Sequence, residues 1–197
     1  MYGASLMDVG VGAMVYTGGL SAGHKLLGNT FNILDILVRC VPLFVLGVGR
    51  GFLIKLTGYH TAVSEYGVHW NFFVTLSFLP FILYLGALLK ELGISLPSFA
   101  TIMMIVYQLI LGMTNLEAYL LSDYRGTDLL SQNKEGLSSL IGYAAIYLYA
   151  AHLGSLQNPA AKKKQLTLIA LASLLTYALF KSTGFLASRR IANLPYV

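Results

Sequence analysis

The stretch that decides the fold class is LPSFATIMMIVYQLILGMT, residues 96–114, which contains no charged side chain. It has about the length of 20 apolar residues that a helix needs to cross a bilayer. Working outward from it, five further apolar segments occur at about 4–20, 33–56, 70–89, 137–156 and 166–186. These segments predict an all-α, polytopic membrane protein, with a single bundle of about six transmembrane helices over residues 1–197.

The composition supports a membrane location. Hydrophobic residues make up 56% of the chain and charged residues 11%, and the mean hydropathy is +0.70, whereas soluble domains carry about 25% charged residues. The net charge of +5 comes from basic residues scattered near the span ends, which fits contact with lipid headgroups and excludes a nucleic-acid-binding surface. Cys40 is the single cysteine, and four dispersed histidines predict no metal site.

The charges outside the spans predict an orientation. The run Lys162–Lys164 places the 157–165 loop in the cytosol by the positive-inside rule. Alternation of the spans then puts the loops at about 58–69 and 115–136 on the lumenal side, and the acidic balance of the second loop agrees. Arg189 and Arg190 fall on the same lumenal side and oppose this orientation.

Charges inside apolar segments are costly, so they are candidates for function. Asp8 interrupts the first segment, where it could contact a substrate or a proton, or lie at a helix end. Asp35 and Arg39 are four residues apart and are predicted to pair on one helix face. Arg50, near the end of the second segment, could hold a phosphate or lie among headgroups.

The run EYGVHWNFF, residues 65–73, brings polar side chains next to an aromatic belt. His69 could act as a general base toward a hydroxyl group, and the Asn71 amide could orient a carbonyl group, with Glu65 nearby. Alternatively, the run is an interfacial aromatic anchor whose polar residues bind one another.

Residues 133–136, NKEG, precede the fifth apolar segment. Glu135 near a helix N-terminus suits the helix dipole, and Lys134 could contact a phosphate from the same side of the membrane as His69. We therefore expect the 58–69 and 115–136 loops to face each other.

Four blocks together carry a family resemblance: SLMDVGVG at Ser5–Gly12, the Glu65–Phe73 run, Asn133–Gly136, and SRRIANLPY at Ser188–Tyr196. They resemble the inositol acyltransferases of GPI-anchor biosynthesis, called PIG-W in animals. The resemblance implies a multi-pass enzyme of the endoplasmic reticulum membrane that transfers a fatty acyl group from acyl-CoA to the inositol of glucosaminyl-phosphatidylinositol. It implies no cofactor beyond acyl-CoA as co-substrate.

Two departures from the family pattern bear on activity. The resemblance implies a catalytic aspartate and lysine upstream of Ser5–Gly12, for which neither Asp8 nor Lys25 substitutes, so the catalytic residues are unknown and His69 is a candidate. Ala62 stands where the family has a histidine. The chain is thus expected to be a partial domain, truncated at both ends.

The predicted substrate contacts are Asp8, Arg50, Glu65, His69, Asn71, Lys134 and Glu135. Two alternatives to an incomplete acyltransferase remain open. One is a non-catalytic membrane scaffold or pseudoenzyme. The other is a transporter segment lined by charged spans, although the sequence has no visible inverted repeat.

Overall fold

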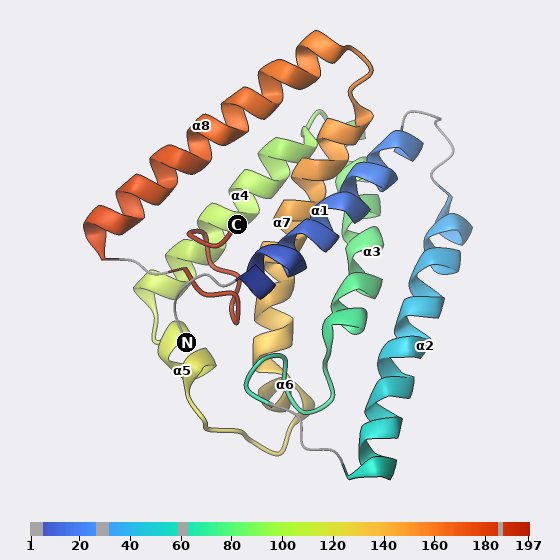
Figure 1. The fold of residues 1–197 in the computed structure, drawn as a ribbon, viewed down its shortest axis with the longest axis vertical. Helices are drawn as coiled ribbons and strands as arrows, with labels where there is room; N and C mark the ends of the chain where they lie inside the picture. The colour runs from blue at the N-terminus through green and yellow to red at the C-terminus, as the bar shows by residue number, and fades with distance from the viewer. Residues whose placement is uncertain (1–5, 27–31, 59–62, 185–186) are drawn as a thin grey trace.

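The computed structural model of the protein describes residues 6–26, 32–58, 63–184 and 187–197, and the regular structure in these ranges is helical throughout. Figure 1 shows the helices in order along the chain: α1 (Leu6–Leu26), α2 (Ile33–Thr57), α3 (Phe72–Glu91), α4 (Leu96–Met113), α5 (Leu116–Leu121), α6 (Leu129–Gln132), α7 (Lys134–Ser155) and α8 (Pro159–Thr183).

Five helices in the described ranges are long and apolar enough to cross a bilayer, namely α2, α3, α4, α7 and α8. Helix α1 is 21 residues long, but Asp8 and several glycines make it less apolar. The prediction of an all-α polytopic membrane protein is therefore confirmed, with five apolar spans and α1 as a further long helix.

Helix α7 forms the centre of the bundle and packs against α1, α3 and α4. Tyr143 on α7 is completely buried. Helix α1 crosses α7 closely, because a Cβ atom at Gly23 would collide with the carbonyl group of Ala151, and one at Gly154 with that of Leu20. Small residues allow membrane helices to approach to this separation.

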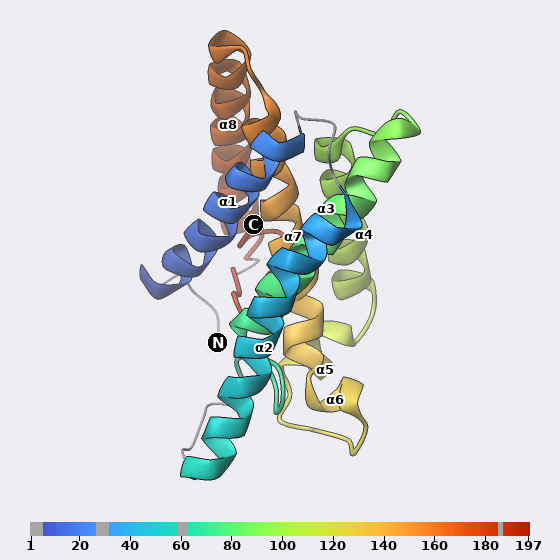
Figure 2. The same cartoon turned by 90° about the vertical axis from the view of Figure 1, so that its right-hand side faces the viewer.

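The outer helices α2 and α8 lie on opposite sides of the bundle (Figures 1 and 2). Helix α2 packs on α3, whereas α8 makes only a narrow contact with α7. No residue of α8 is buried. Helix α2 has few buried residues, Ile36 and Cys40 among them. Both helices are thus far less buried than α7, and most of their apolar side chains are available to lipid.

Two helices begin earlier than the hydropathy pattern predicts. Helix α7 begins at Lys134 rather than near residue 137, and α8 begins at Pro159 rather than near residue 166. The start of α8 has a clear local cause, since Asn158 caps the helix through its side chain and proline is favoured at the first helical position. Lys162–Lys164, predicted in a loop, are therefore part of α8.

The two predicted polar loops lie at the same end of the bundle (Figure 1). The predicted 115–136 loop contains α5 and α6 and the start of α7. The predicted 58–69 loop is described from residue 63 onward, and residues 59–62, which include His60 and Ala62, lie outside the described residues. The compartment that this end faces stays a prediction.

Candidate functional site

Glu135, in the first turn of α7, has no exposed surface. Arg125 donates to both of its carboxylate oxygens, from Nη2 to Oε1 at 2.8 Å and from Nη1 to Oε2 at 3.1 Å. Arg190 donates from Nη2 to the same Oε1 at 2.8 Å. A carboxylate buried in an apolar helix is costly unless it is paired in this way. This triad ties the α5–α6 loop and the C-terminal segment to α7.

Arg189 forms a second charged group beside the first. Its Nε atom lies 2.5 Å from Asp8 Oδ1 of α1, and its Nη2 atom lies 3.0 Å from Glu65 Oε1. Its Nη1 atom also donates to the Tyr66 hydroxyl at 3.2 Å. Burial raises the pKa of Tyr66, and the positive charge of Arg189 offsets part of that increase. Tyr66 is therefore a neutral hydroxyl at physiological pH.

Asn133 joins the two polar loops. Its side-chain oxygen accepts hydrogen bonds from the backbone N–H groups of His69 at 2.8 Å and Trp70 at 2.9 Å. Gly67, at φ 120°, fits directly against Asn133, where a Cβ atom would collide. The His69 ring is exposed, and its Nε2 atom lies 3.1 Å from Gln132 Oε1. The two loops are thus in contact, as the pattern of charges led us to expect.

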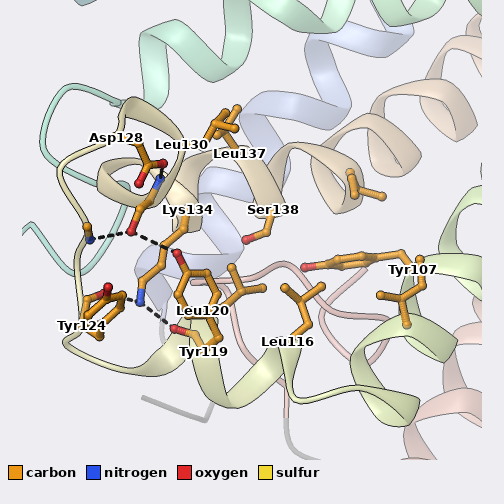
Figure 3. A pocket seen from close by; sticks show the side chains of 14 residues that line it. Tyr107, Leu116, Tyr119, Leu120, Tyr124, Asp128, Leu130, Lys134, Leu137 and Ser138 are labelled. Carbon is orange, nitrogen blue, oxygen red and sulfur yellow. Dashed lines mark hydrogen bonds between the residues drawn. The ribbon is translucent and has the colours of Figure 1, made fainter.

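Lys134 is 4% exposed, and its ammonium group is surrounded by oxygen atoms of the protein. It donates to the carbonyl oxygens of Tyr119 at 2.6 Å and Tyr124 at 2.8 Å (Figure 3). It donates as well to the carbonyl oxygen of Ser122 at 2.9 Å. It also lies 4.4 Å from the centre of the Tyr119 ring. A lysine that binds the last carbonyl groups of α5 stabilises that helix end and the loop after it.

The C-terminal segment, residues 187–197, is packed into the bundle rather than free. The Tyr107 hydroxyl of α4 donates to the Ile191 carbonyl group at 2.7 Å, and Ala192 fits against Gly142 of α7. The Tyr196 hydroxyl donates to the Asp8 carbonyl group at 2.9 Å. These contacts hold Arg189 and Arg190 at the polar end of the bundle.

The structure brings together most of the residues predicted as substrate contacts. Asp8, Glu65, His69, Lys134 and Glu135 belong to the connected polar cluster at this end.

The two other predicted contacts lie apart from those ion pairs. Asn71 is buried and caps α3, and it also donates to the Gly47 carbonyl group of α2 at 2.8 Å. Arg50 is exposed on α2. The ion pairs among the described residues do not include the predicted Asp35–Arg39 pair, and Asp35 is exposed. That prediction is therefore wrong, because an exposed i, i+4 pair gains little from holding two side chains together.

Sequence reasoning missed the roles of Arg125, Arg189 and Arg190. The two adjacent C-terminal arginines counted as part of a resemblance block and as evidence against the predicted orientation, but they were not assigned a partner. A signal was available, since a carboxylate such as Glu135 at the start of an apolar segment needs basic partners. Both arginines bind carboxylates of the protein, so they are not free to bind lipid headgroups. Their position is therefore weaker evidence against the predicted orientation.

A cavity of about 590 Å³ lies next to the cluster, between α4, α5 and the first turns of α7 (Figure 3). Lys134 and Ser138 line one side of it, and Tyr107, Leu116 and Leu120 line the other. Its remaining lining includes the aliphatic side chains of Ile110, Leu130, Leu137 and Ile141. The described residues contain no group of three or more His, Cys, Asp or Glu side chains that could hold a metal ion.

The apolar spans and the buried ion-pair cluster define a class of protein, a polytopic helical membrane protein with a charged site at one end of its bundle. A protein-family model described as GWT1 matches residues 1–197. This chain belongs to the GWT1 family.

Curated relatives carry the name GPI-anchored wall transfer protein 1. The relative from Schizosaccharomyces pombe is 38% identical over 213 residues, which cover 100% of this chain and 45% of the relative. The relative from Gibberella zeae is 37% identical over 233 residues, covering 100% of this chain and 46% of the relative. The relative from Aspergillus fumigatus is 34% identical over 229 residues, with 100% and 45% covered. This chain thus spans about half the length of these relatives.

Proposed function

We propose that this chain forms part of an enzyme of GPI-anchor biosynthesis in the endoplasmic reticulum membrane. The enzyme would transfer a fatty acyl group from acyl-CoA to the inositol of glucosaminyl-phosphatidylinositol. Membership of the GWT1 family and the GPI-related name of its relatives support a role in this pathway. The finer assignment of acyl transfer rests on the sequence resemblance to the PIG-W acyltransferases.

The observation that carries the proposal is the convergence of the four resemblance blocks. Asp8, Glu65, Glu135 and Arg189 come from four blocks that are far apart along the chain, yet they meet in one cluster of ion pairs and hydrogen bonds. Tyr66 of the second block also joins the third, because its carbonyl group accepts from the Gly136 N–H at 2.9 Å. Distant segments that converge on buried charges are typical of functional sites in membrane proteins.

The geometry suggests a division of labour within the cluster. Glu135 and Lys134 are buried and engaged with the protein, so the proposal gives them the task of positioning the loops. Glu65 is 41% exposed and the His69 ring is exposed, so these side chains can reach a ligand at the membrane boundary. Arg190 Nε is buried and has no acceptor among the described residues, so it retains one donor for an anionic group.

The proposed reaction is a transfer from a thioester to an alcohol. An inositol hydroxyl oxygen attacks the thioester carbonyl carbon, a C–O ester bond forms and the C–S bond breaks. The hydroxyl proton goes to a base, and the CoA thiolate leaves and takes up a proton. The exposed His69 imidazole is the described side chain best suited to accept that proton, while guanidinium groups can bind phosphates of either substrate.

The test is an acylation assay in cells that lack the endogenous inositol acyltransferase. The cells express this chain alone, or together with the remaining segments of the Schizosaccharomyces pombe relative, and palmitoylation of glucosaminyl-phosphatidylinositol is followed by lipid chromatography. We expect product in the combined form, and its loss in the Glu135→Gln variant but not in the matched exposed variant Glu91→Gln.

Each outcome of the assay has a defined meaning. Product from this chain alone would mean that the chain contains the general base of the reaction. Loss of product in the His69→Ala variant would then identify His69 as that base. Absence of product in both forms, with both proteins correctly inserted in the membrane, would contradict the acyltransferase assignment. A non-catalytic scaffold would then be favoured, since the buried charges already satisfy one another.

A further inference from the structure

The cavity beside the cluster is separate from the ion pairs described above. Its volume of about 590 Å³ lies within the roughly 300–1,000 Å³ of small-molecule sites. In Figure 3, Tyr107, Leu116, Leu120 and Ser138 surround one common space from α4, α5 and α7.

Tyr124 and Asp128 lie at the exposed rim of the cavity, and the polar side chains deeper in its wall are already bound by the protein. The Tyr107 hydroxyl donates to a backbone carbonyl group, the Tyr119 hydroxyl donates to Ser131 Oγ at 3.0 Å, and the Lys134 ammonium group binds three carbonyl oxygens. The rest of the wall is mainly aliphatic, formed by Ile110, Leu116, Leu120, Leu130, Leu137 and Ile141. Inside this rim a polar group would lose its hydration without gaining partners, whereas an apolar chain would lose nothing.

The mouth of the cavity lies where a span meets the polar end of the bundle. Tyr124 and Leu130, which line it, are 68% and 70% exposed, and the rings of Tyr119 and Tyr124 lie 6.4 Å apart. Tyrosines in this position are typical of the membrane interface. From Lys134 to Ile141 the wall follows α7 for about 10 Å. The cavity therefore opens at the depth where lipid chains begin and extends toward the apolar layer.

We propose that this cavity binds one hydrocarbon chain, which belongs either to the acyl donor or to a membrane lipid. Binding of a hydrocarbon chain stands on the cavity alone, and only the acyl-donor source rests on the proposed function. Lys134 shapes the site by fixing the end of α5 and the loop that forms its rim. The wall that limits the depth of the site, around Leu116 and Ile141, then discriminates between chains of different length.

The experiment is photo-crosslinking of the full chain in nanodiscs. Two probes are compared, palmitoyl-CoA and phosphatidylcholine, each with a diazirine near the end of a fatty acyl chain, and the labelled residues are mapped by mass spectrometry. The site is narrowed by Leu116→Trp and independently by Ile141→Phe, with Leu175→Trp on exposed α8 as the control. Size-exclusion chromatography establishes which variants remain folded.

The expected result is label concentrated on residues 107–141 that the two narrowing variants reduce at least about tenfold, since each displaced methylene costs about fourfold in affinity. Label spread evenly over the exposed leucines of α2 and α8, unchanged by either variant, would overturn the proposal. Labelling by phosphatidylcholine alone would overturn only the acyl-donor source. The acylation assay above is decided separately, because it reads product and not chain binding.

Discussion

Helices α7 and α8 follow each other along the chain and have similar lengths of 22 and 25 residues, but their surroundings differ. An 18-residue stretch of α8 has a mean hydropathy of 1.5, against 1.2 for the corresponding stretch of α7, and yet none of the α8 stretch is buried, against 61% of the α7 stretch. In water, the hydrophobic effect would favour burial of the more apolar stretch, which is that of α8. In a bilayer, the helix that requires protein partners is the one that the bundle surrounds.

The side chains explain the difference. Helix α7 carries Glu135, which needs arginine partners, and Gly142 and Gly154, which accept neighbouring backbones at close range. Helix α8 presents leucines that lipid chains cover as well as protein would, for example Leu174 and Leu175. Burial in this protein therefore follows polarity and small size rather than hydrophobicity.

The largest expected effect comes from removing the buried charge of α7. Glu135→Gln leaves Arg125 and Arg190 without their carboxylate, which should lower the free energy of unfolding by about 3–5 kcal/mol. Unfolding by denaturing detergent in mixed micelles measures this loss. The exposed Glu91→Gln variant of α3 is the control, and equal stability of the two variants would show that the triad contributes nothing.

The next effect concerns Lys134. Lys134→Met removes an ammonium group that binds three carbonyl oxygens and leaves them buried without a donor, so we expect a loss of about 3 kcal/mol. Hydrogen exchange should increase in residues 116–128, which this side chain holds. The control Lys25→Met changes an exposed lysine of α1. Unchanged exchange in Lys134→Met would contradict the role given to the ammonium group.

A smaller effect should follow from widening the α1–α7 contact. Gly154→Ala places a methyl group against the Leu20 carbonyl group, and overpacking of this kind costs about 1–3 kcal/mol. Gly112→Ala on α4 adds the same methyl group where nothing lies within 4 Å, so its stability should change by less than about 0.5 kcal/mol. An unchanged free energy of unfolding in the Gly154→Ala variant would mean that α1 and α7 do not approach each other as closely as described.

The smallest effect is expected on α8. Leu175→Ala should change the free energy of unfolding by less than about 0.5 kcal/mol, because Leu175 has no packed protein environment to lose. The same mixed-micelle titration tests this. A loss above 2 kcal/mol would be typical of a buried leucine and would remove the contrast between α7 and α8.

Hydropathy was sufficient to predict most of the fold. The span predicted at residues 96–114 corresponds to α4, and that at 33–56 to α2. The early starts of α7 and α8 escaped hydropathy because Lys134 and Lys162–Lys164 are charged, although the Asn158-Pro159 pair is a recognisable helix start. The burial of α7 could not be predicted from hydropathy either, since the apolar stretch of α8 has the higher mean hydropathy and lies exposed.

The candidate site could be predicted in part. The sequence pattern indicated that the Glu65–Phe73 run and Asn133–Gly136 would face each other, and Asn133 does join them. The partners of Asp8 and Glu135 could not be identified from the sequence. Arg189 and Arg190 follow α8 in the chain and contact these carboxylates only because the C-terminal segment packs against the bundle. Such a return depends on tertiary packing, for example of Ala192 against Gly142, which no local pattern encodes.

The central claim is that the C-terminal segment binds Glu135 of α7 and so joins distant blocks of the chain, and a double-mutant cycle between Glu135 and Arg190 tests it most directly. The variants Glu135→Gln, Arg190→Gln and the double variant are unfolded in mixed micelles, and the coupling free energy is calculated. Since the two side chains lie 2.8 Å apart, we predict a favourable coupling of about 1–3 kcal/mol. Additive effects, with a coupling near zero, would mean that the C-terminal segment does not bind α7 and would contradict the account.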